Sequence, residues 1–515
     1  MVQSRNHDTI RRSGSNRGDM QTIAHWLDGK PFAGTSSATA PVTNPATGVV
    51  TGQVALAGVE DARAVIASAK AAFPEWRDTS LARRTQILFR FRELLNERKE
   101  ELAKLITAEH GKVHSDALGE VNRGLEVIEF ACGVPHLIKG GFTENASTKV
   151  DIFSIRQPLG PVAVISPFNF PAMVPMWFFP IAIAAGNTVV LKPSEKDPSS
   201  SLWLAELWHE AGLPAGVFNV LQGDKVAVDE LLDNPHIKAV SFVGSTPIAK
   251  YVYQRGTASG KRVQALGGAK NHMVVLPDAD LDLAADAAVN AGFGSAGERC
   301  MAISVVLAVG AVGDELVAKI TERAKTIKTG DGTRDTDMGP LVTREHRDRV
   351  AAYIDAGESD GASVVLDGRG IQVDGEADGF WLGPTVLDHV GSGMSVYTDE
   401  IFGPVLSVVR VDSYDEALEL VNDNPYGNGT AIFTNDGGAA RRFHNEVEVG
   451  MVGINVPIPV PMAYYSFGGW KNSLFGDSHA HGIEGVHFFT RGKAVTTRWL
   501  DPSHGGLELG FPQNK

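Results

Sequence analysis

Short apolar segments alternate with amphipathic stretches through the middle of the chain, and this alternation limits the fold more than any other feature. Continuously apolar runs, typical of buried strands, lie at 161–165, 187–192, 217–221 and 239–243. Helical patterns at 199–211 and 227–233 separate the later runs. Strands that alternate with helices pair in parallel, so the sequence predicts an α/β fold with a doubly wound sheet.

Polar residues follow three of these predicted strands, where open α/β sheets bind ligands. Asn169 could donate to a developing oxyanion, or it could simply stabilise a turn. Lys192 and Glu195 could bind ribose hydroxyls. Ser245 lies in a segment similar to a mononucleotide-binding unit, but no full G-x-G-x-x-G motif is present. The only feature of this segment that could bind phosphate is therefore a helix N-terminus.

Cys300 is the candidate nucleophile. Small residues at 292–297 let the backbone bend close to a ligand, and they place this cysteine ahead of an apolar run. A buried structural thiol is the alternative, as we expect for Cys132. Arg299 favours the catalytic interpretation, because we expect its guanidinium to lower the pKa of the neighbouring thiol.

Composition favours small-molecule chemistry. A chain of 515 residues predicts at least two domains. Its net charge of -14, without a basic run, disfavours nucleic acid and anionic membranes as partners. Two cysteines supply no disulfide framework, which indicates a reducing compartment, and no apolar stretch is long enough to span a bilayer. We expect a cytoplasmic protein.

The first residues are predicted to be a disordered tail, at 1–21, because arginines there are mixed with Ser, Asn and Gly. They lack the apolar region of a secretory signal. Met20 could be an alternative start, and an organellar transit peptide remains an alternative.

Helical spacing predicts a long helical region at 59–109, broken at Pro74, and a further helix at 108–129. On that second stretch alone, Arg123 is most simply a surface arginine. His272 is expected to be a core or turn histidine and not a base. His479 and His481 form an H-x-H pair, but no carboxylate or cysteine cluster accompanies them, so we expect no metal site.

Seven ordered motifs resemble the aldehyde dehydrogenase superfamily, over nearly the whole chain after about residue 22. They are PFNFP at 167–171, LKPSE at 191–195, FVGS at 242–245, ALGG at 265–268, GERC at 297–300, EIFGP at 400–404 and FGGWKNS at 467–473.

This resemblance implies a division of the chain into three parts. They are a Rossmann-type NAD-binding domain from 22–140 and 159–266, an α/β catalytic domain at 267–465, and a small β oligomerisation flap from 141–158 and 480–500. The resemblance also implies a homotetramer.

The same resemblance implies roles for the residues. Cys300 would attack an aldehyde, and the Asn169 amide and the Cys300 backbone N–H would stabilise the oxyanion; hydride then passes to NAD and a thioester remains. Lys192 and Glu195 would hold the adenosine ribose, and this glutamate favours NAD because a carboxylate repels a 2′-phosphate. Further implied cofactor contacts are Ser245 to the pyrophosphate, Glu400 to the nicotinamide ribose, and Ser166, Phe168, Lys196 and Gly267 along the same cleft.

One position departs from the pattern of the hydrolytic members. They begin the glycine turn with a glutamate that activates water, whereas this chain has Ala265. A methyl group cannot accept a proton, so another base or another nucleophile must remove the acyl group. A thiol is the obvious nucleophile, although Glu298 could rescue attack by water.

GERCMA, QALGGAKNH and GEVNRGLE resemble one branch of the superfamily, the CoA-acylating methylmalonate-semialdehyde dehydrogenases. This resemblance replaces the surface interpretation of Arg123: with Arg299 it would anchor a substrate carboxylate. It implies NAD and coenzyme A, with methylmalonate semialdehyde giving propionyl-CoA, carbon dioxide and NADH, and malonate semialdehyde giving acetyl-CoA. A hydrolytic dehydrogenase of uncharged aldehydes and a catalytically silent structural homologue are the alternatives.

Overall fold

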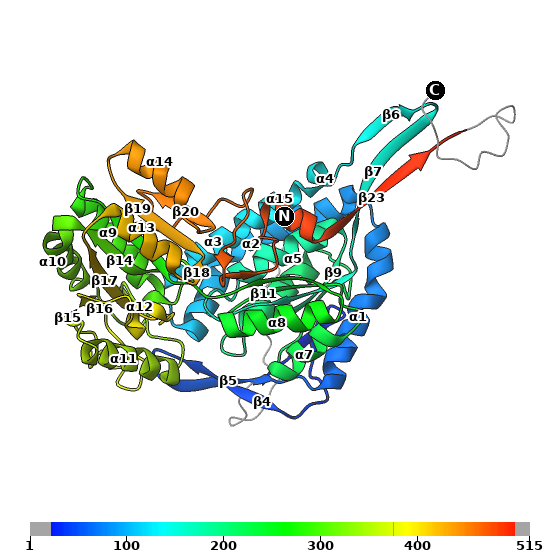
Figure 1. The fold of residues 1–515 in the computed structure, drawn as a ribbon. Coiled ribbons are helices and arrows are strands. Elements are labelled where there is room, and N and C mark those ends of the chain that lie inside the picture. The colour runs from blue at the N-terminus through cyan, green and yellow to red at the C-terminus, as the bar shows by residue number, and fades with distance from the viewer. Residues whose placement is uncertain (1–21, 374, 500–515) are drawn as a thin grey trace, which may run out of the picture.

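The computed structural model describes residues 22–373 and 375–499. The predicted disordered tail and the alternative start at Met20 lie outside these residues. Within them, no helix combines the length and apolar character that crossing a membrane requires. Two large sheets, each covered by helices, form the two halves of the described chain (Figure 1).

The first large sheet has eight strands in the described chain. In spatial order they are β22 (Leu474–Phe475), β12 (Arg262–Leu266), β11 (Ala239–Val243), β8 (Pro161–Ile165), β9 (Thr188–Lys192), β10 (Phe218–Val220), β2 (His25–Leu27) and β3 (Lys30–Phe32). The five central strands, β12 to β10, are parallel and almost fully buried. The predicted doubly wound parallel sheet is therefore confirmed.

Helices cover both faces of this sheet because successive residues of a strand point to opposite sides. Val162 and Val164 of β8 pack toward one helical layer, whereas Ala163 and Ile165 pack toward the other. The first layer is α2 (Leu81–His110), α3 (His114–Cys132), α4 (Val134–Leu137), α5 (Met173–Ala185) and α6 (Ser199–Glu210). The second layer is α1 (Val59–Asp78), α7 (Lys225–Asp233) and α8 (Thr246–Ala258).

The second large sheet carries the other half of the described chain. Its strands, in spatial order, are β15 (Ser363–Leu366), β16 (Thr385–Asp388), β17 (Val405–Val411), β14 (Ile303–Val309), β13 (Asn271–Val275), β19 (Gly429–Phe433) and β20 (Met451–Ile454). Its helical elements are α9 (Leu281–Phe293), η1 (Gly294–Gly297), η2 (Gly310–Val312), α10 (Gly313–Ala324), α11 (Arg344–Ser359), α12 (Ser395–Thr398), α13 (Tyr414–Asp423) and α14 (Gly437–Glu446).

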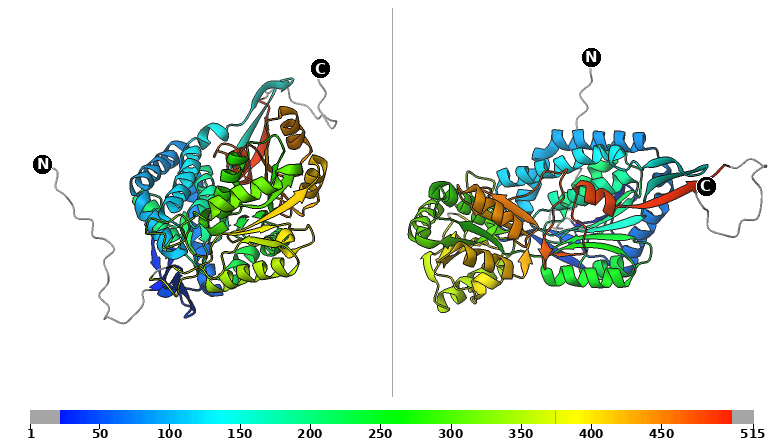
Figure 2. Two further views of the ribbon diagram at one scale, coloured as in Figure 1. Left: turned by 90° about the vertical axis from the view of Figure 1, so that its left-hand side faces the viewer. Right: turned by 45° about the horizontal axis from the view of Figure 1, so that its top comes forward.

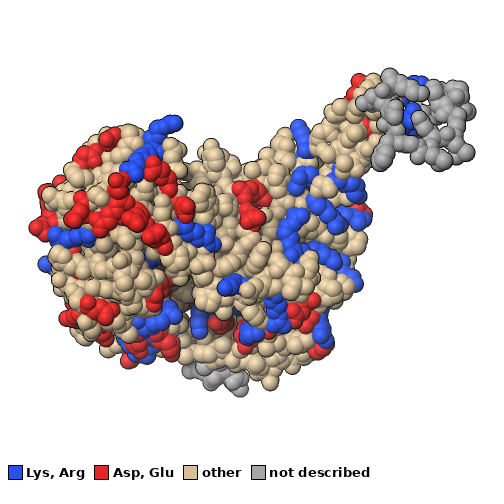
Figure 3. All heavy atoms as spheres, viewed as in Figure 1, with Lys and Arg blue, Asp and Glu red and all other residues tan. Residues whose placement is uncertain are grey.

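A small sheet projects from the body as an arm (Figures 1 and 2). It joins β6 (Phe142–Ser147), β7 (Val150–Pro158) and β23 (Thr490–Thr497). The predicted flap at 480–500 is only partly strand, because α15 (Gly482–Phe488) precedes β23. Arg156 and Arg262 both donate to the His487 carbonyl at the end of that helix. Lys and Arg gather beside the arm in Figure 3, whereas Asp and Glu are numerous over the other half.

The helical region does not break at Pro74 as predicted. Pro74 lies inside α1, and the helical region breaks instead at 79–80, where the Ser80 hydroxyl caps α2 by accepting from the Arg83 N–H. The turn at 44–48 joins β4 (Thr39–Asn44) to β5 (Val49–Ala55), which pair with each other, and β5 also pairs with β1 (Thr22–Ile23). The preceding segment pairs separately, as β2 and β3 at the edge of the eight-stranded sheet. A short pair, β18 (Tyr426–Gly427) and β21 (Trp470–Lys471), lies apart from these sheets.

The glycine turn at 267–268 links the two halves. β12, before it, belongs to the eight-stranded sheet, and β13, after it, belongs to the other large sheet. This position places the turn where the carboxyl end of one sheet meets the second half.

Candidate active site

Cys300 follows a tight turn that leads into β14. Ser295, Ala296 and Gly297 have positive φ values of 52°, 52° and 72°. A Cβ at position 297 would lie 2.2 Å from the carbonyl oxygen of Gly403, so only glycine fits there. The predicted bend of the backbone is therefore present, and it leaves Cys300 partly exposed.

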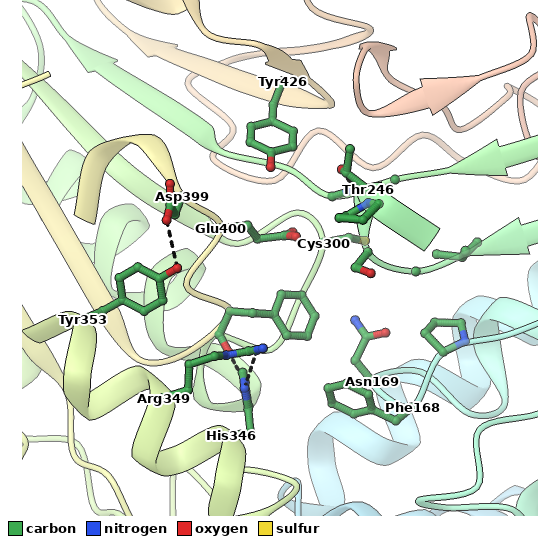
Figure 4. A pocket seen from close by; sticks show the side chains of 18 residues that line it. Phe168, Asn169, Thr246, Cys300, His346, Arg349, Tyr353, Asp399, Glu400 and Tyr426 are labelled. Carbon is green, nitrogen blue, oxygen red and sulfur yellow. Dashed lines mark hydrogen bonds between the residues drawn. The ribbon is translucent and has the colours of Figure 1, made fainter. Parts of the chain in front are cut away.

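Two pockets meet at Cys300. The first, of about 370 Å³, lies at the carboxyl ends of β8 and β11, and we call it the sheet-edge pocket (Figure 4). Its lining residues are Pro167, Phe168, Asn169, Val243, Gly244, Ser245, Thr246, Pro247, Gly267, Gly268, Cys300, His346, Arg349, Tyr353, Asp399, Glu400, Phe402 and Tyr426.

The second pocket, of about 580 Å³, contains two guanidinium groups, and we call it the arginine pocket. Its lining residues are Asp116, Gly119, Glu120, Asn122, Arg123, Phe170, Met173, Trp177, Arg299, Cys300, Met301, Ile458, Val460 and Phe467. Arg123 and Arg299, which are far apart in the sequence, are thus brought to the same pocket as the thiol.

Asn169 is held by a buried ion pair that the sequence did not reveal. Its amide donates to the Glu298 carbonyl at 3.0 Å, and its own carbonyl accepts from Lys112 Nζ at 2.5 Å. Lys112 Nζ also lies 2.8 Å from Glu120 Oε2. Glu120 Oε1 in turn accepts from the N–H groups of Ala172 and Met173, at the start of α5. The pair therefore fixes the loop that carries Asn169.

One signal for this pair was present in the sequence. Asp116, Glu120 and Arg123 follow one another at helical spacing of four and three residues, which places them on one face of α3. When polar residues at that spacing include a predicted ligand residue, they indicate that this face of the helix contributes to a binding site and is not simply exposed to solvent.

The Cys300 thiol is less acidic than predicted from its neighbour. Burial, and then the charge of Glu400, raise the pKa of Cys300 to about 12. Arg299 acts in the expected direction but is the weakest of the influences. Its guanidinium is paired with Asp116, so much of its charge is compensated. The predicted direction of the Arg299 effect is therefore confirmed, but burial and Glu400 outweigh it, so the net pKa of the thiol is raised.

Glu400 points toward Cys300 (Figure 4). Its Oε1 accepts from the Ala269 N–H at 2.9 Å, and burial raises the pKa of its carboxyl to about 7. A Cβ on Gly268 would lie 2.2 Å from Glu400 Oε2, so the glycine turn makes room for this carboxyl.

The predicted cofactor residues divide into two groups. Phe168, Ser245, Gly267 and Glu400 line the sheet-edge pocket together with Asn169 and Cys300. Residues at the ends of β8 and β9 lie outside that lining: Ser166, Lys192 and Glu195. Lys192 Nζ is 3.5 Å from Glu195 Oε2, and Lys196 lines a different cavity beside Pro41 and Thr43.

The sheet-edge pocket fits a phosphate-bearing nucleotide. Ser245 is the N-cap residue of α8 but makes no side-chain capping bond, and it lines the pocket with Thr246 and Pro247, so the N-terminus of α8 lies at the pocket. A Cβ on Gly244 would lie 2.6 Å from the Phe242 ring, so the backbone there lacks room for a side chain. The buried Ser166 hydroxyl has no hydrogen-bond partner among the described residues. β8, between β9 and β11, is also where the strand order reverses.

Residues of α11 complete the pocket and were missed by the sequence analysis. His346 and Arg349 donate and accept along one chain: Arg349 donates to His346 Nδ1 at 2.7 Å, and His346 Nε2 donates to the Phe402 carbonyl at 2.7 Å. The Tyr353 hydroxyl donates to Asp399 at 3.0 Å (Figure 4). Their spacing along one face of the helix was the available signal.

Glu298 does not offer its carboxyl to Cys300. Its Oε1 accepts from the Val342 N–H at 3.2 Å and lies 3.5 Å from His346 Nε2. The side chain is fully buried and lines neither pocket. The expectation that Glu298 could activate water is therefore not supported. Ala265 is buried in β12.

Histidines predicted as structural occupy structural positions. His272 is buried, with Nε2 3.2 Å from the Tyr397 hydroxyl, as expected for a core residue. Among the described residues, no group of three or more His, Cys, Asp or Glu side chains could hold a metal ion. The buried Cys132 is likewise part of the core.

Comparison with known proteins agrees with this geometry. The model of the aldehyde dehydrogenase family matches residues 32–495. The malonate-semialdehyde dehydrogenase of Pseudomonas aeruginosa PAO1 is 55% identical over 496 residues, which cover 96% of this chain and 100% of that protein. Malonate-semialdehyde dehydrogenase 3 of Geobacillus kaustophilus is 50% identical, with 93% and 99% covered.

Two solved structures are similar to this chain, and to the same degree. The methylmalonate-semialdehyde dehydrogenase of Oceanimonas doudoroffii has a TM-score of 0.93 and 52% identity, and covers 94% of this chain and 99% of its own. A Sinorhizobium meliloti 1021 protein complexed with NAD has the same TM-score, identity and coverage. With a cysteine between two pockets and these relatives along nearly its whole length, the chain belongs to the aldehyde dehydrogenase family.

Proposed function

We propose that this protein catalyses the NAD-dependent, CoA-acylating oxidation of malonate semialdehyde and methylmalonate semialdehyde, with loss of carbon dioxide. The products would be acetyl-CoA or propionyl-CoA, carbon dioxide and NADH. The observation that carries the proposal is that Arg123, Arg299 and Cys300 line one pocket. Relatives named for these two semialdehydes support it.

The arginine pocket suits an aldehyde that bears a carboxylate. Guanidinium groups bind carboxylates through directed, charge-assisted hydrogen bonds. The remaining wall is mostly apolar, with Phe170, Trp177 and Phe467 beside the thiol. A short semialdehyde could therefore place its carboxylate on the arginines and its carbonyl carbon at Cys300.

The sheet-edge pocket would hold NAD. Ser245 and the N-terminus of α8 would bind the pyrophosphate, and Glu400 would accept a hydrogen bond from a ribose hydroxyl. Lys192 and Glu195, at the end of β9, would reach the adenosine ribose. When bound, NAD supplies the acceptor for the hydride that leaves the substrate carbon. The NAD complex of the Sinorhizobium meliloti relative supports this assignment.

After the Cys300 thiol has lost its proton to solvent, its sulfur would form a bond to the aldehyde carbon, and the π electron pair of the carbonyl moves to the oxygen, which then carries negative charge. The Asn169 amide and the Cys300 backbone N–H would donate to that oxygen. The Lys112–Glu120 pair keeps the Asn169 loop fixed while charge develops. After oxidation, the acyl group remains on Cys300 as a thioester.

The carboxylate would then leave from the Cys300 thioester. As the bond to the carboxylate carbon breaks, its electron pair moves into the thioester carbonyl, and the same oxyanion donors stabilise the enolate before solvent protonates it. Because Ala265 supplies no base, the thiol of coenzyme A would then displace the Cys300 sulfur. This exchange forms the CoA thioester and returns the free thiol.

The test is NADH and carbon dioxide formation from malonate semialdehyde, measured with and without coenzyme A. We expect sustained turnover only with coenzyme A, and acetyl-CoA as the product. Turnover at one rate in both conditions, with free acid as product, would instead identify a hydrolytic dehydrogenase. Stoichiometric alkylation of Cys300 in a protein without measurable turnover would identify a silent homologue.

The arm supports a proposal about assembly. Phe142 and Ile152 on its strands are 67% and 38% exposed, and β20 is an edge strand of the second large sheet. An edge strand and an exposed apolar ribbon are surfaces that a second copy of the chain could cover. We propose a homotetramer in the cytoplasm, and light scattering at several protein concentrations would test its mass.

A further inference from the structure

Asp116 lies in the wall of the arginine pocket and contacts Arg299 directly. Its Oδ1 accepts a hydrogen bond from Arg299 Nη2, and both side chains line the same pocket as Cys300. The two residues are 183 positions apart, so the fold alone brings them together. One guanidinium of the pocket is therefore already paired with a carboxylate of the protein.

The other cations around this pocket are paired in the same way. Arg123 Nη1 lies 2.8 Å from Glu126 Oε2, and Lys112 Nζ lies 2.8 Å from Glu120 Oε2. The Arg299–Asp116 pair completes the set. The described charges around the pocket thus balance in pairs, and a ligand carboxylate must share or displace a carboxylate of the protein.

Asp116 makes the fewest hydrogen bonds of these three carboxylates. Glu120 is buried and accepts from Lys112 and from two backbone N–H groups, whereas Glu126 contacts Arg123 through both of its oxygens. Among the described residues, Asp116 contacts Arg299 through one oxygen and makes no other side-chain hydrogen bond. Its side chain is 23% exposed, so it can turn toward water.

We propose that Asp116 is a specificity-determining residue that competes with the substrate carboxylate for Arg299. This proposal rests on the proposed function, because it assumes that a carboxylate enters the arginine pocket. The substrate displaces Asp116 from Arg299, which weakens binding relative to an unpaired guanidinium. Once the carboxylate has left as carbon dioxide, Asp116 pairs with Arg299 again and the pocket no longer favours an anion.

The test compares Asp116→Asn with Glu129→Gln. Glu129 is also on α3, but its carboxylate pairs with Arg92 away from the pocket, so its removal is a matched control for loss of charge. We measure KM for malonate semialdehyde and the Kd of 3-hydroxypropanoate, a carboxylate without an aldehyde. Asp116→Asn should lower both about fivefold or more, because the competing anion is gone. Glu129→Gln should lower neither.

The ratio of kcat/KM for malonate semialdehyde to kcat/KM for propanal should also rise in Asp116→Asn. Unchanged or higher values of KM and Kd would overturn the inference, because they would show that Asp116 orients Arg299 instead of competing with the substrate. If Asp116→Asn does not fold, Asp116→Ala is the second variant, since alanine suits a helix and carries no charge.

The two proposals fail in different ways. If the unmodified protein shows no preference for malonate semialdehyde over propanal, the proposed function fails whatever Asp116→Asn does. If that preference is present and Asp116→Asn does not strengthen semialdehyde binding, only the role of Asp116 fails.

Discussion

Replacing the buried Lys112 with methionine tests how strongly the Lys112–Glu120 pair holds Asn169. The ammonium lies 2.8 Å from Glu120 Oε2 and 2.5 Å from the Asn169 carbonyl oxygen. Removing one partner of a buried ion pair leaves an uncompensated charge, which costs about 3–5 kcal/mol. Glu120 keeps the N–H donors of Ala172 and Met173, so we expect the lower end, about 3 kcal/mol, in the free energy of unfolding.

The same substitution should lower kcat more than it raises KM. Without the ammonium, the Asn169 loop loses the contact that fixes its carbonyl, and the amide can move from the oxyanion position. Loss of one oxyanion donor lowers kcat by roughly 10²–10³, so a displaced donor should lower it by about tenfold or more. Urea unfolding gives the stability, and NADH formation at saturating semialdehyde and coenzyme A gives kcat.

Two controls make this prediction decisive. Glu129→Gln breaks the exposed Arg92–Glu129 pair of the same helix, and we expect a change below about 1 kcal/mol and an ordinary kcat. Combining Lys112→Met with Glu120→Gln removes the unpaired charge and should restore part of the lost stability. The reasoning is refuted if Lys112→Met unfolds and turns over like Glu129→Gln.

Three further outcomes follow from the site. Ala265→Glu should increase turnover without coenzyme A, measured as NADH formed from malonate semialdehyde, because a carboxylate could then activate water; an unchanged rate would contradict this. Arg123→Ala or Arg299→Ala should lower the ratio of kcat/KM for semialdehyde to kcat/KM for propanal by about tenfold or more; an unchanged ratio would argue against the anchor. Burial raises the pKa of Glu298 to about 8, so the folded state holds its proton more tightly than the unfolded state. The free energy of unfolding should therefore fall as pH rises from about 5 through 8, and Glu298→Gln should flatten that dependence in urea titrations at each pH.

The parallel sheet could be predicted from the sequence because its central strands are buried on both faces. A strand of this kind is a continuous apolar run, and the runs at β8, β9, β10 and β11 matched within two residues at each end. The edge strands could not be assigned in this way. β2 and β3 have only three residues each, and their place beside β10 depends on a long-range antiparallel pairing that no local pattern specifies.

The sequence could predict which residues of the candidate site are brought to the pocket by the course of the backbone, but not which side chains contact one another there. Asn169 was predicted from a turn after a strand and Cys300 from the bend of small residues before an apolar run, and both line the sheet-edge pocket. The partners of charged side chains could not be predicted, because Arg299 meets Asp116 only after α3 packs beside the turn before β14. The net rise of the thiol pKa could not be predicted either, because burial and the charge of Glu400, which outweigh Arg299, depend on the fold.

Glu298 shows why closeness in sequence is a poor guide to chemistry at this site. The residue is two positions from Cys300, but the positive-φ turn at 295–297 sends its carboxyl toward Val342 and His346, behind the pocket wall. Only its backbone carbonyl takes part, by accepting from the Asn169 amide. A base for water is thus absent from position 265 and is not supplied from position 298. Both positions together support the proposal that an external thiol removes the acyl group, and the Ala265→Glu variant tests it directly.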